Sequence, residues 1–380
     1  MTTAWNYPGR RAALEQRMAE QGVDLMFLPV SADLEYLTGL QRRMPAFGTV
    51  GYAHHWVAGA LLAPGREPVF VLPRMITEFD LPEGVVGEVV TVNESDDGRA
   101  IMASVLGRFG AVGTLALGNR AWAESVLELT ALARPERSIS AESLVNPLRR
   151  IKSADELAAM KAACDVVDAV MADVQNKVVP GVTELELASE VAYRMKLAGS
   201  RTESFDTGVW SMGPGDERDA TVRVSQAPLR PGMGVSFDFG AVVEGYCSDF
   251  GRTVHIGEPS AEYQRVYELV MAAQQAGIDA VRPGVTAAQV HAATRQVIVD
   301  GGYGDWFRHR TGHCIGLDVH ELPYISEEDD TPLEEGMTFT IEPSVFWPGR
   351  VGVRVEDIVV CGPQGGYKLN DHPTTMVVSP

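Results

Sequence analysis

Cysteine is scarce in this sequence, which has four cysteines in 380 residues. They are scattered, with no CxxC pair, and this excludes a paired-cysteine zinc or redox motif and a disulfide framework. The first eight residues lack the basic start and apolar core of a signal peptide. We therefore expect a protein of a reducing, cytoplasmic compartment.

Positive charge and long apolar runs are also in short supply. Lysine and arginine number 32 against 51 aspartates and glutamates, a formal net charge of −19. That balance argues against nucleic acid and against an anionic membrane surface as partners. The longest apolar run, near residues 56–64, is too short to span a bilayer. The hydrophobic content of 45% is that of an ordinary globular chain.

The length is sufficient for two domains with separate cores. Over the first 150 residues, helical and strand-like patterns alternate, which predicts an α/β domain. The segment 146–152 is expected to connect it to a second domain, 151–380, whose first helix begins at the capping box Ser153 to Glu156. The expected helices of the first domain are 9–22, 31–40, 97–109 and 120–133, and the strands are 23–28, 56–63, 67–73, 88–93 and 114–118.

An internal repeat organises the second domain. Pro180-Gly-Val-Thr183 recurs as Pro283-Gly-Val-Thr286, and in each copy the threonine opens a capping box. Both copies are preceded by one helix, begin another, and lead towards a hairpin. We expect two related helix–helix–hairpin halves folded about a pseudo-twofold axis.

Each half ends in a hairpin that carries two acids. Residues 235–253 predict a hairpin about the turn 242–245, which would set Asp238 opposite Asp249. In the second half, strand-like residues flank the turn 347–350, and Glu342 and Glu356 are symmetric about Gly349. Facing carboxylates repel one another, so a divalent cation is expected between them.

A histidine segment, Gly312-His313-Cys314, lies between the two hairpins. Its imidazole and the four acids make an oxygen-rich set that suits Mn²⁺, Co²⁺ or Fe²⁺, with Zn²⁺ also possible. Two such ions would share a bridging water and supply hydroxide at neutral pH, which is hydrolytic chemistry. The expected ligands of the two metal ions are Asp238, Asp249, His313, Glu342 and Glu356.

Three further residues are candidates for the reaction itself. His309 and His320 are near His313 in sequence and could donate to a developing oxyanion or move a proton, or could simply be hydrogen-bonded in the core. Arg354 shares a strand face with Glu356 and could orient that carboxylate or grip a substrate carboxyl group. Cys314 is expected to be a small packed residue and not a nucleophile.

The combined motifs resemble those of the pita-bread metallopeptidases. That family includes methionine aminopeptidase, aminopeptidase P, prolidase and the metal-free creatinase, and the resemblance covers about 151–380. A creatinase-like domain in front of it is similar to the aminopeptidase P, prolidase and creatinase branch. The segments that carry the resemblance are Phe237-Asp238-Phe-Gly, Tyr246-Cys-Ser-Asp249, Arg252-Thr253, Gly312-His313, Val319-His320-Glu321, Thr340-Ile-Glu342-Pro343 and Arg354-Val-Glu356-Asp357.

The resemblance implies a cytoplasmic Xaa-Pro dipeptidase or aminopeptidase that acts on a dipeptide or other small substrate and forms a homodimer. It assigns the four acids and the imidazole named above as the ligands. Glu342 would also accept the proton of the attacking water. His309, His320 and Arg354 would line the substrate pocket and stabilise the tetrahedral intermediate.

One departure from the family pattern keeps other functions open. Peptidases of this family carry a histidine upstream of the first ligand aspartate, whereas this chain has none between His55 and His255. The alternative is a metal-dependent hydrolase or lyase of the same fold that acts on a small non-peptide, osmolyte-like or creatine-like substrate. A non-enzymatic binding module is a third reading, against which the complete ligand set argues.

Overall fold

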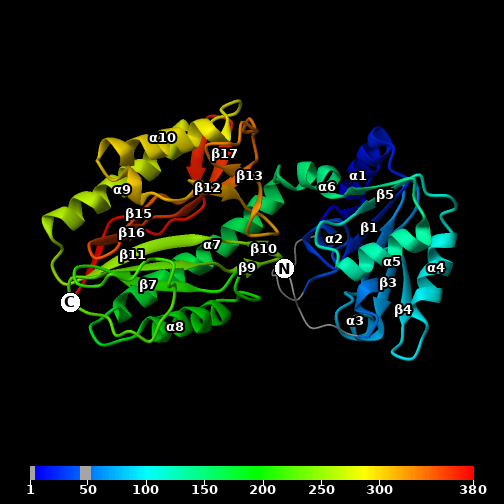
Figure 1. Ribbon diagram of the computed structural model, residues 1–380, viewed down its shortest axis with the longest axis horizontal. Coiled ribbons are helices and arrows are strands. Elements are labelled where there is room, and N and C mark those ends of the chain that lie inside the picture. The colour runs from blue at the N-terminus through cyan, green and yellow to red at the C-terminus, as the bar shows by residue number, and fades with distance from the viewer. Residues whose placement is uncertain (1–4, 43–52) are drawn as a thin grey trace. The chain divides into compact units, whose positions relative to one another are not determined.

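The structure is a computed structural model that describes residues 5–42 and 53–380. The chain divides into two compact units, Met1–Arg149 and Arg150–Pro380. Figure 1 shows that the first unit consists of helices around one sheet, whereas the second carries long helices over several smaller sheets.

The first unit is an α/β domain built on a mixed six-stranded sheet of order β4-β3-β2-β1-β5-β6. β1 pairs with β5 in parallel and with β2 in antiparallel orientation. Its strands are β1 (Leu25–Pro29), β2 (Gly59–Leu62), β3 (Val69–Pro73), β4 (Glu88–Val92), β5 (Thr114–Leu117) and β6 (Arg137–Ser140). Its helices are α1 (Tyr7–Gln21), α2 (Ala32–Thr38), the short 3₁₀ helix η1 (His55–Val57), α3 (Arg74–Phe79), α4 (Gly98–Gly107), α5 (Ala123–Ala133) and α6 (Glu142–Arg149).

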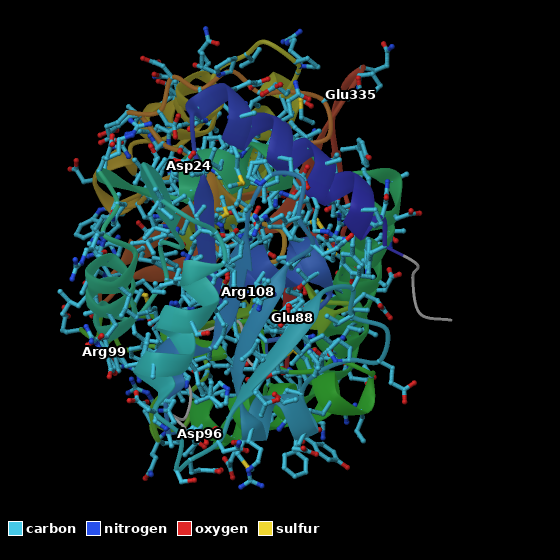
Figure 2. The ribbon with its side chains drawn as sticks, turned by 90° about the vertical axis from the view of Figure 1, so that its right-hand side faces the viewer. Asp24, Glu88, Asp96, Arg99, Arg108 and Glu335 are labelled. Carbon is cyan, nitrogen blue, oxygen red and sulfur yellow. The ribbon has the colours of Figure 1, made fainter. Side chains whose placement is uncertain are left out.

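The side chains of β1 point alternately to the two faces of the sheet, so they contribute to the core on both sides of it. Leu25 and Phe27 pack into one cluster with Met102 of α4 and Leu129 of α5. Because successive side chains of a strand point to opposite faces of the sheet, Met26 points to the face opposite Leu25 and Phe27. On the surface, Arg108 after α4 pairs with Glu88 of β4 (Nη1–Oε1 2.9 Å; Figure 2), an exposed pair that contributes little to stability.

The expected connection between the domains is partly helical, because α6 extends through its first residues. This helix includes Pro147. Proline cannot donate to the carbonyl four residues earlier. Here Nη2 of Arg17 of α1 donates to the oxygen of Ser143 at 3.0 Å in place of the amide that Pro147 lacks, and Nε of Arg17 donates to the oxygen of Leu144 at 3.0 Å. A tertiary contact within the first unit thus allows a helix where local sequence predicts a linker.

The second unit contains four long helices and two main sheets, of orders β19-β11-β8-β7 and β13-β12-β14-β17-β18. The helices are α7 (Ala154–Val174), α8 (Glu184–Leu197), α9 (Ala261–Ala280) and α10 (Ala287–Asp300), with 3₁₀ turns η2 (Gln175–Lys177) and η3 (Gly304–Trp306). The strands of the first half are β7 (Gly208–Met212), β8 (Gly234–Phe239), β9 (Val242–Val243), β10 (Tyr246–Cys247) and β11 (Phe250–Ile256). Those of the second half are β12 (Gly312–Cys314), β13 (Glu321–Ile325), β14 (Thr338–Ile341), β15 (Ser344–Trp347), β16 (Val351–Arg354), β17 (Asp357–Gly362), β18 (Gly365–Lys368) and β19 (Val377–Ser379).

The predicted repeat is confirmed in the backbone of this unit. Thr183 and Thr286 close full capping boxes at the start of α8 and α10. Each threonine also bridges to a proline further along its own half, Pro228 in the first and Pro332 in the second. Equivalent local sequences have therefore folded into equivalent helix–helix–strand modules.

The register of the first hairpin differs from the prediction. Asp238 of β8 pairs with Gly251 of β11 and not with Asp249, which precedes β11. The reason is the turn, in which Glu244 and Gly245 both have positive φ (50° and 86°) and form a two-residue loop. The midpoint of this two-residue loop lies one residue later in the chain than the midpoint of the turn expected at 242–245. Each residue of β8 therefore pairs with a residue two positions later than predicted.

The second hairpin has the predicted register, but its strands are interrupted. Ser344 faces Arg354 in the β15–β16 ribbon, while Ile341 faces Asp357 in the main sheet. The interruption falls at Glu342-Pro343 on one side and at Val355-Glu356 on the other. Both glutamates therefore lie where the chain passes from one sheet to another.

Candidate metal centre

A single row of residues crosses the middle of the second unit. Gly208 of β7 pairs with Asp238 of β8, which pairs in turn with Gly251 of β11. Gly251 then bridges to Glu356 of the other half, with the amide nitrogen of Glu356 2.9 Å from the oxygen of Gly251. The two halves of the repeat therefore meet beside Asp238.

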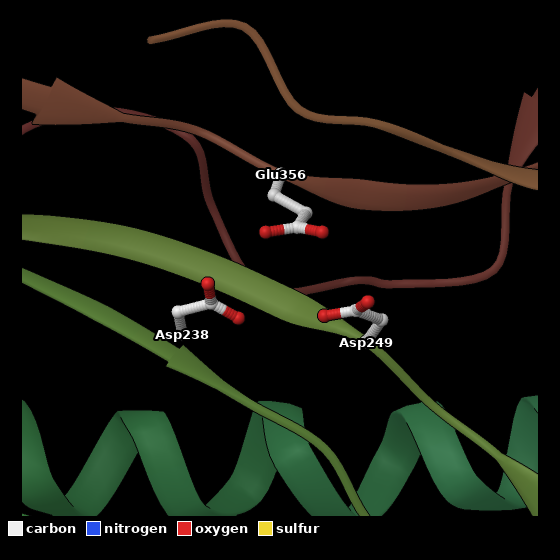
Figure 3. A group of neighbouring side chains, drawn as sticks. All are labelled: Asp238, Asp249 and Glu356. Atoms are coloured by element: carbon white, nitrogen blue, oxygen red, sulfur yellow. The ribbon is translucent and has the colours of Figure 1, made fainter. Parts of the chain in front are cut away.

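Gly251 makes room for the acids of this row. A Cβ atom at residue 251 would lie 2.8 Å from Oε2 of Glu356 and 3.0 Å from Cδ of Arg354. Because glycine leaves this space open, Glu356 approaches Asp238 and Asp249. Ligand oxygens of these three buried carboxylates lie within 4.8 Å of one another (Figure 3).

His313 presents a lone pair to the same centre. Its Nδ1 lies 3.1 Å from the backbone oxygen of Cys314, which can only accept, so the proton is on Nδ1 in the neutral ring. Nε2 then faces Oδ2 of Asp249 at 3.3 Å and Oε1 of Glu342 at 3.6 Å. A histidine whose second nitrogen is fixed by a carbonyl is the usual arrangement for a metal ligand.

The electrostatics of the centre also call for a cation. Burial, reinforced by Asp249 and Glu342, raises the pKa of Glu356 well above its usual range. Burial likewise raises the pKa of Asp249, reinforced by the charge of Asp238 and opposed by the neighbouring His313. Oδ1 of Asp249 and Oε2 of Glu356 are buried without a hydrogen-bond partner. These unpaired oxygens and the bare imidazole nitrogen fit divalent cations.

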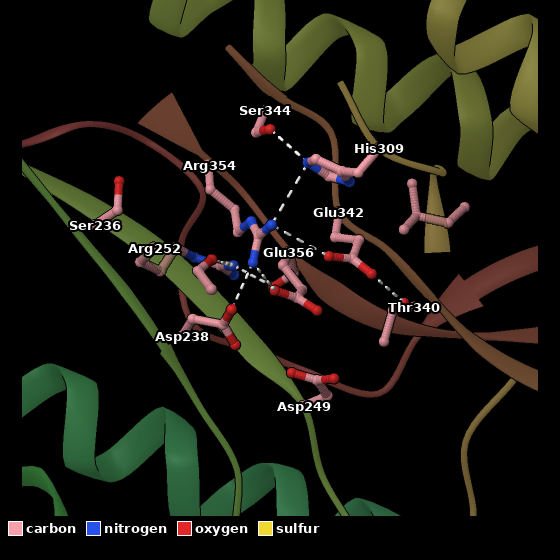
Figure 4. Close-up of polar contacts among 12 residues, drawn as sticks. Ser236, Asp238, Asp249, Arg252, His309, Thr340, Glu342, Ser344, Arg354 and Glu356 are labelled. Carbon is pink, nitrogen blue, oxygen red and sulfur yellow. Dashed lines mark hydrogen bonds and ion pairs between the residues drawn. The ribbon is translucent and has the colours of Figure 1, made fainter. Parts of the chain in front are cut away.

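Arg354 compensates part of the negative charge (Figure 4). Its Nη1 lies 2.5 Å from Oδ2 of Asp238, and its Nη2 lies 3.5 Å from Oε2 of Glu342. Burial alone would raise the pKa of Glu342, but nearby positive charge, chiefly that of Arg354, outweighs it and lowers that pKa. Glu342 is therefore ionised at neutral pH and able to accept a proton.

The two accessory histidines occupy different environments. Nδ1 of His309 lies 2.7 Å from the oxygen of Arg310, so its Nε2 is an acceptor, 2.6 Å from Oγ of Ser344 and 3.4 Å from Nη2 of Arg354. Burial and the nearby charge of Arg354 lower the pKa of His309 to about 4. The ring of His320 is exposed and meets that of His313 edge to face, with centroids 4.1 Å apart. Of the two, His320 is the one with a ring free to donate into the pocket.

Cys314 is buried, and burial raises the pKa of its thiol to about 12. A thiol with so high a pKa is not a nucleophile at neutral pH, as the sequence predicts.

All eight candidate residues line one pocket of about 650 Å³. Sequence reasoning missed a further wall, formed by Phe205, Asp206, Thr207, Arg223 and Val224. Arg223 forms an ion pair with Asp238, and its guanidinium lies 5.2 Å from the ring of Trp210. The segment 210–224 stands out in the sequence for its lack of histidine, but nothing in its pattern identifies Arg223, which reaches the pocket from a loop.

Among residues 5–42 and 53–380, no helix is long and apolar enough to cross a membrane.

Comparison with known proteins bears on both units. The family model of metallopeptidase family M24 matches residues 158–363, and that of the creatinase/prolidase N-terminal domain matches residues 10–151. Among curated proteins, the probable dipeptidase PepE of Mycobacterium tuberculosis is 35% identical over 98% of this chain and 97% of its own length. The Xaa-Pro dipeptidase of Pyrococcus furiosus is 31% identical over 95% of this chain and 97% of its own.

Solved structures agree. A prolidase from Thermococcus sibiricus superposes with a TM-score of 0.89 at 31% identity, covering 99% of this chain and all of its own. The dipeptidase PepE of Mycobacterium ulcerans gives a TM-score of 0.84 at 35% identity, and each chain is covered in full. The predicted fold, a creatinase-like domain followed by a pita-bread domain, is confirmed.

Proposed function

The chain belongs to metallopeptidase family M24 and is a peptidase, and we propose that it is a dinuclear Xaa-Pro dipeptidase. One observation carries the proposal: four buried carboxylates and one imidazole nitrogen converge in a pocket, and two of the carboxylate oxygens lack a hydrogen-bond partner. The names of the relatives, Xaa-Pro dipeptidase and probable dipeptidase, favour a peptide substrate over the non-peptide alternative.

The residues that would hold two divalent cations are Asp238, Asp249, His313, Glu342 and Glu356. Such cations supply Lewis-acid activation of water and polarisation of the scissile carbonyl. The hard, oxygen-rich set favours Mn²⁺, with Co²⁺, Fe²⁺ and Zn²⁺ as alternatives. The charges of Asp238 and Glu342 both raise the pKa of Asp249 and that of Glu356, so a cation would relieve repulsion across the whole group.

The chain's own residues divide the remaining work. Glu342, ionised and held by Thr340 Oγ1 at 3.2 Å from Oε1, accepts the proton of the attacking water and returns it to the leaving amine. His320 donates to the oxygen that becomes negative in the tetrahedral intermediate. Arg354 orients Asp238 and Glu342, while His309 holds the guanidinium from behind through its acceptor nitrogen.

Release of free proline tests the proposal. Purified protein loaded in turn with Mn²⁺, Co²⁺, Fe²⁺ or Zn²⁺ should hydrolyse Xaa-Pro dipeptides, and Asp238→Asn should abolish the activity. A matched control is Asp173→Asn, since Asp173 is exposed and pairs only with Arg194 at the surface. Absence of turnover of every dipeptide with all four metals would contradict the proposal.

A cytoplasmic location and a homodimeric state are also expected of a protein with this function. Four buried free cysteines are in keeping with a cytoplasmic protein. The homodimer expected from the family resemblance is a prediction that sedimentation velocity tests, and a single species at the mass of one chain would exclude it.

A further inference from the structure

We propose that Arg223 binds the free carboxylate of the substrate and so confines the enzyme to dipeptides. This inference rests on the proposed function and adds a specificity-determining residue to it. Its basis is the pocket wall that carries Arg223 and Thr207, next to the candidate metal centre, with the buried Trp210 under the guanidinium of Arg223.

The position of Arg223 is built into the sheet. Asp238 is flanked by two glycines, Gly251 on one side and Gly208 on the other. A Cβ atom at residue 208 would lie 2.5 Å from Nη2 and 2.8 Å from Nε of Arg223. The side chain of Arg223 therefore crosses β7 through the space that glycine leaves, and this brings its guanidinium to Asp238.

The loop that carries Arg223 is anchored at several points. The backbone oxygen of Arg223 accepts from Val209 of β7 at 2.8 Å. Five residues earlier, Arg218 pairs with the fully buried carboxylate of Glu184, which also accepts from the amide of Ser225 at 3.0 Å. Arg223 is thus held between two fixed points and needs little ordering to bind a ligand.

The guanidinium has capacity for a second anion. One nitrogen, Nη2, pairs with Asp238, and one face covers Trp210, while the side chain is 47% exposed towards the pocket. Arginine offers five donors in a planar fork that matches a carboxylate, so donors remain after the contact with Asp238. Arg354 lies over the same indole at 5.6 Å, and the two guanidinium groups concentrate positive charge at this end of the pocket.

The charge of the loaded pocket makes an anion the complementary ligand. Five carboxylates and three guanidinium groups line it, a formal charge of −2, which two divalent cations would turn into +2. Arg223 and Arg354 meet at Oδ2 of Asp238, and Arg223 is the more accessible of the two, with its side chain 47% exposed against 11% for Arg354. The group of a dipeptide that supplies a negative charge close to the scissile bond is its C-terminal carboxylate.

The test compares each Xaa-Pro dipeptide with its C-terminal amide. For Arg223→Gln in the metal-loaded full-length enzyme, the ratio of kcat/KM for acid over amide should fall at least about tenfold, mainly through KM, because a charge-assisted contact is lost. Gly208→Ala, which keeps the arginine but obstructs its path, should shift the ratio in the same direction. Arg230→Gln is the matched control, since Arg230 is half-exposed on the same loop, pairs with Asp216 and does not line the pocket.

The outcomes are separable. If the wild-type enzyme cleaves dipeptides but Arg223→Gln lowers acid and amide turnover equally, or leaves the ratio unchanged, Arg223 is not the carboxylate site. Loss of Mn²⁺ binding in Arg223→Gln, measured by calorimetry, would assign the residue to support of Asp238 and also overturn the proposal. A wild-type enzyme that cleaves no dipeptide at all would refute the proposed function itself.

Discussion

Asp249 lies buried among other carboxylates, with one oxygen that no donor satisfies. We predict that Asp249→Asn makes the metal-free protein more stable, by on the order of 2 kcal/mol, because the variant removes a repelled charge and can donate to His313. In Mn²⁺ the order should reverse, because only the wild type gains stability from binding. Thermal midpoints in chelator and in Mn²⁺ measure both effects, and the same order in the two buffers would contradict the assignment.

His372 tests the electrostatics away from the metal centre. Burial and the charge of Arg252 lower its pKa to about 4. A histidine with a lowered folded-state pKa binds protons better when unfolded, so its contribution to stability is present above pH about 6.5 and is lost as pH falls towards 4. His372→Asn should reduce the loss of unfolding free energy over this range by about 2 kcal/mol.

Urea unfolding at pH 7 and pH 4.5 provides the measurement for His372. Replacing the histidine also leaves a cavity, which lowers the free energy of unfolding at both pH values. The quantity to compare between wild type and variant is therefore the change in the free energy of unfolding from pH 7 to pH 4.5. An unchanged difference would show that His372 titrates alike in the folded and unfolded protein.

At the scale of elements, the strand pairing decides which side chains meet. Glu356 reaches Asp238 over Gly251, whose missing side chain leaves the space for its carboxylate. We predict that Gly251→Ala weakens Mn²⁺ binding at least about tenfold, since the added methyl group displaces a ligand in a tightly packed region. Calorimetric titration measures the affinity.

Gly107→Ala is the corresponding control. Gly107 ends α4, and a Cβ atom there meets no other atom within 4 Å. Its substitution should leave Mn²⁺ affinity unchanged. Equal affinities for wild type and Gly251→Ala would show that Glu356 does not depend on this space.

The hairpin registers show where reasoning from local sequence succeeds and where it fails. In the second hairpin the symmetry about Gly349 gives the observed partners. In the first, the two-residue turn at Glu244 and Gly245 displaces the pairing, so Asp238 faces a glycine. Glu244 at positive φ is the cause, since a glutamate gives no sequence signal for that conformation.

At the scale of the whole molecule, all proposed ligands belong to the unit Arg150–Pro380. Metal binding should therefore stabilise the chain by linkage, by about 2.7 kcal/mol at a free Mn²⁺ concentration of one hundred times Kd. Differential scanning calorimetry across a Mn²⁺ series should show a midpoint that rises with concentration and returns on addition of chelator. A midpoint independent of Mn²⁺ would mean that the folded state does not bind the ion.

The sequence alone determined the repeat, the capping boxes, the two-domain composition and the set of acids and histidines, because these depend on residue type and on spacing along the chain. It did not determine that Asp238 lies between Gly208 and Gly251, or that Arg223 reaches the pocket. Those features arise only when strands from both halves pair and a distant loop folds over them, and no local pattern encodes such contacts. The tertiary structure therefore decided how the acids converge and that Arg223 lines the same pocket.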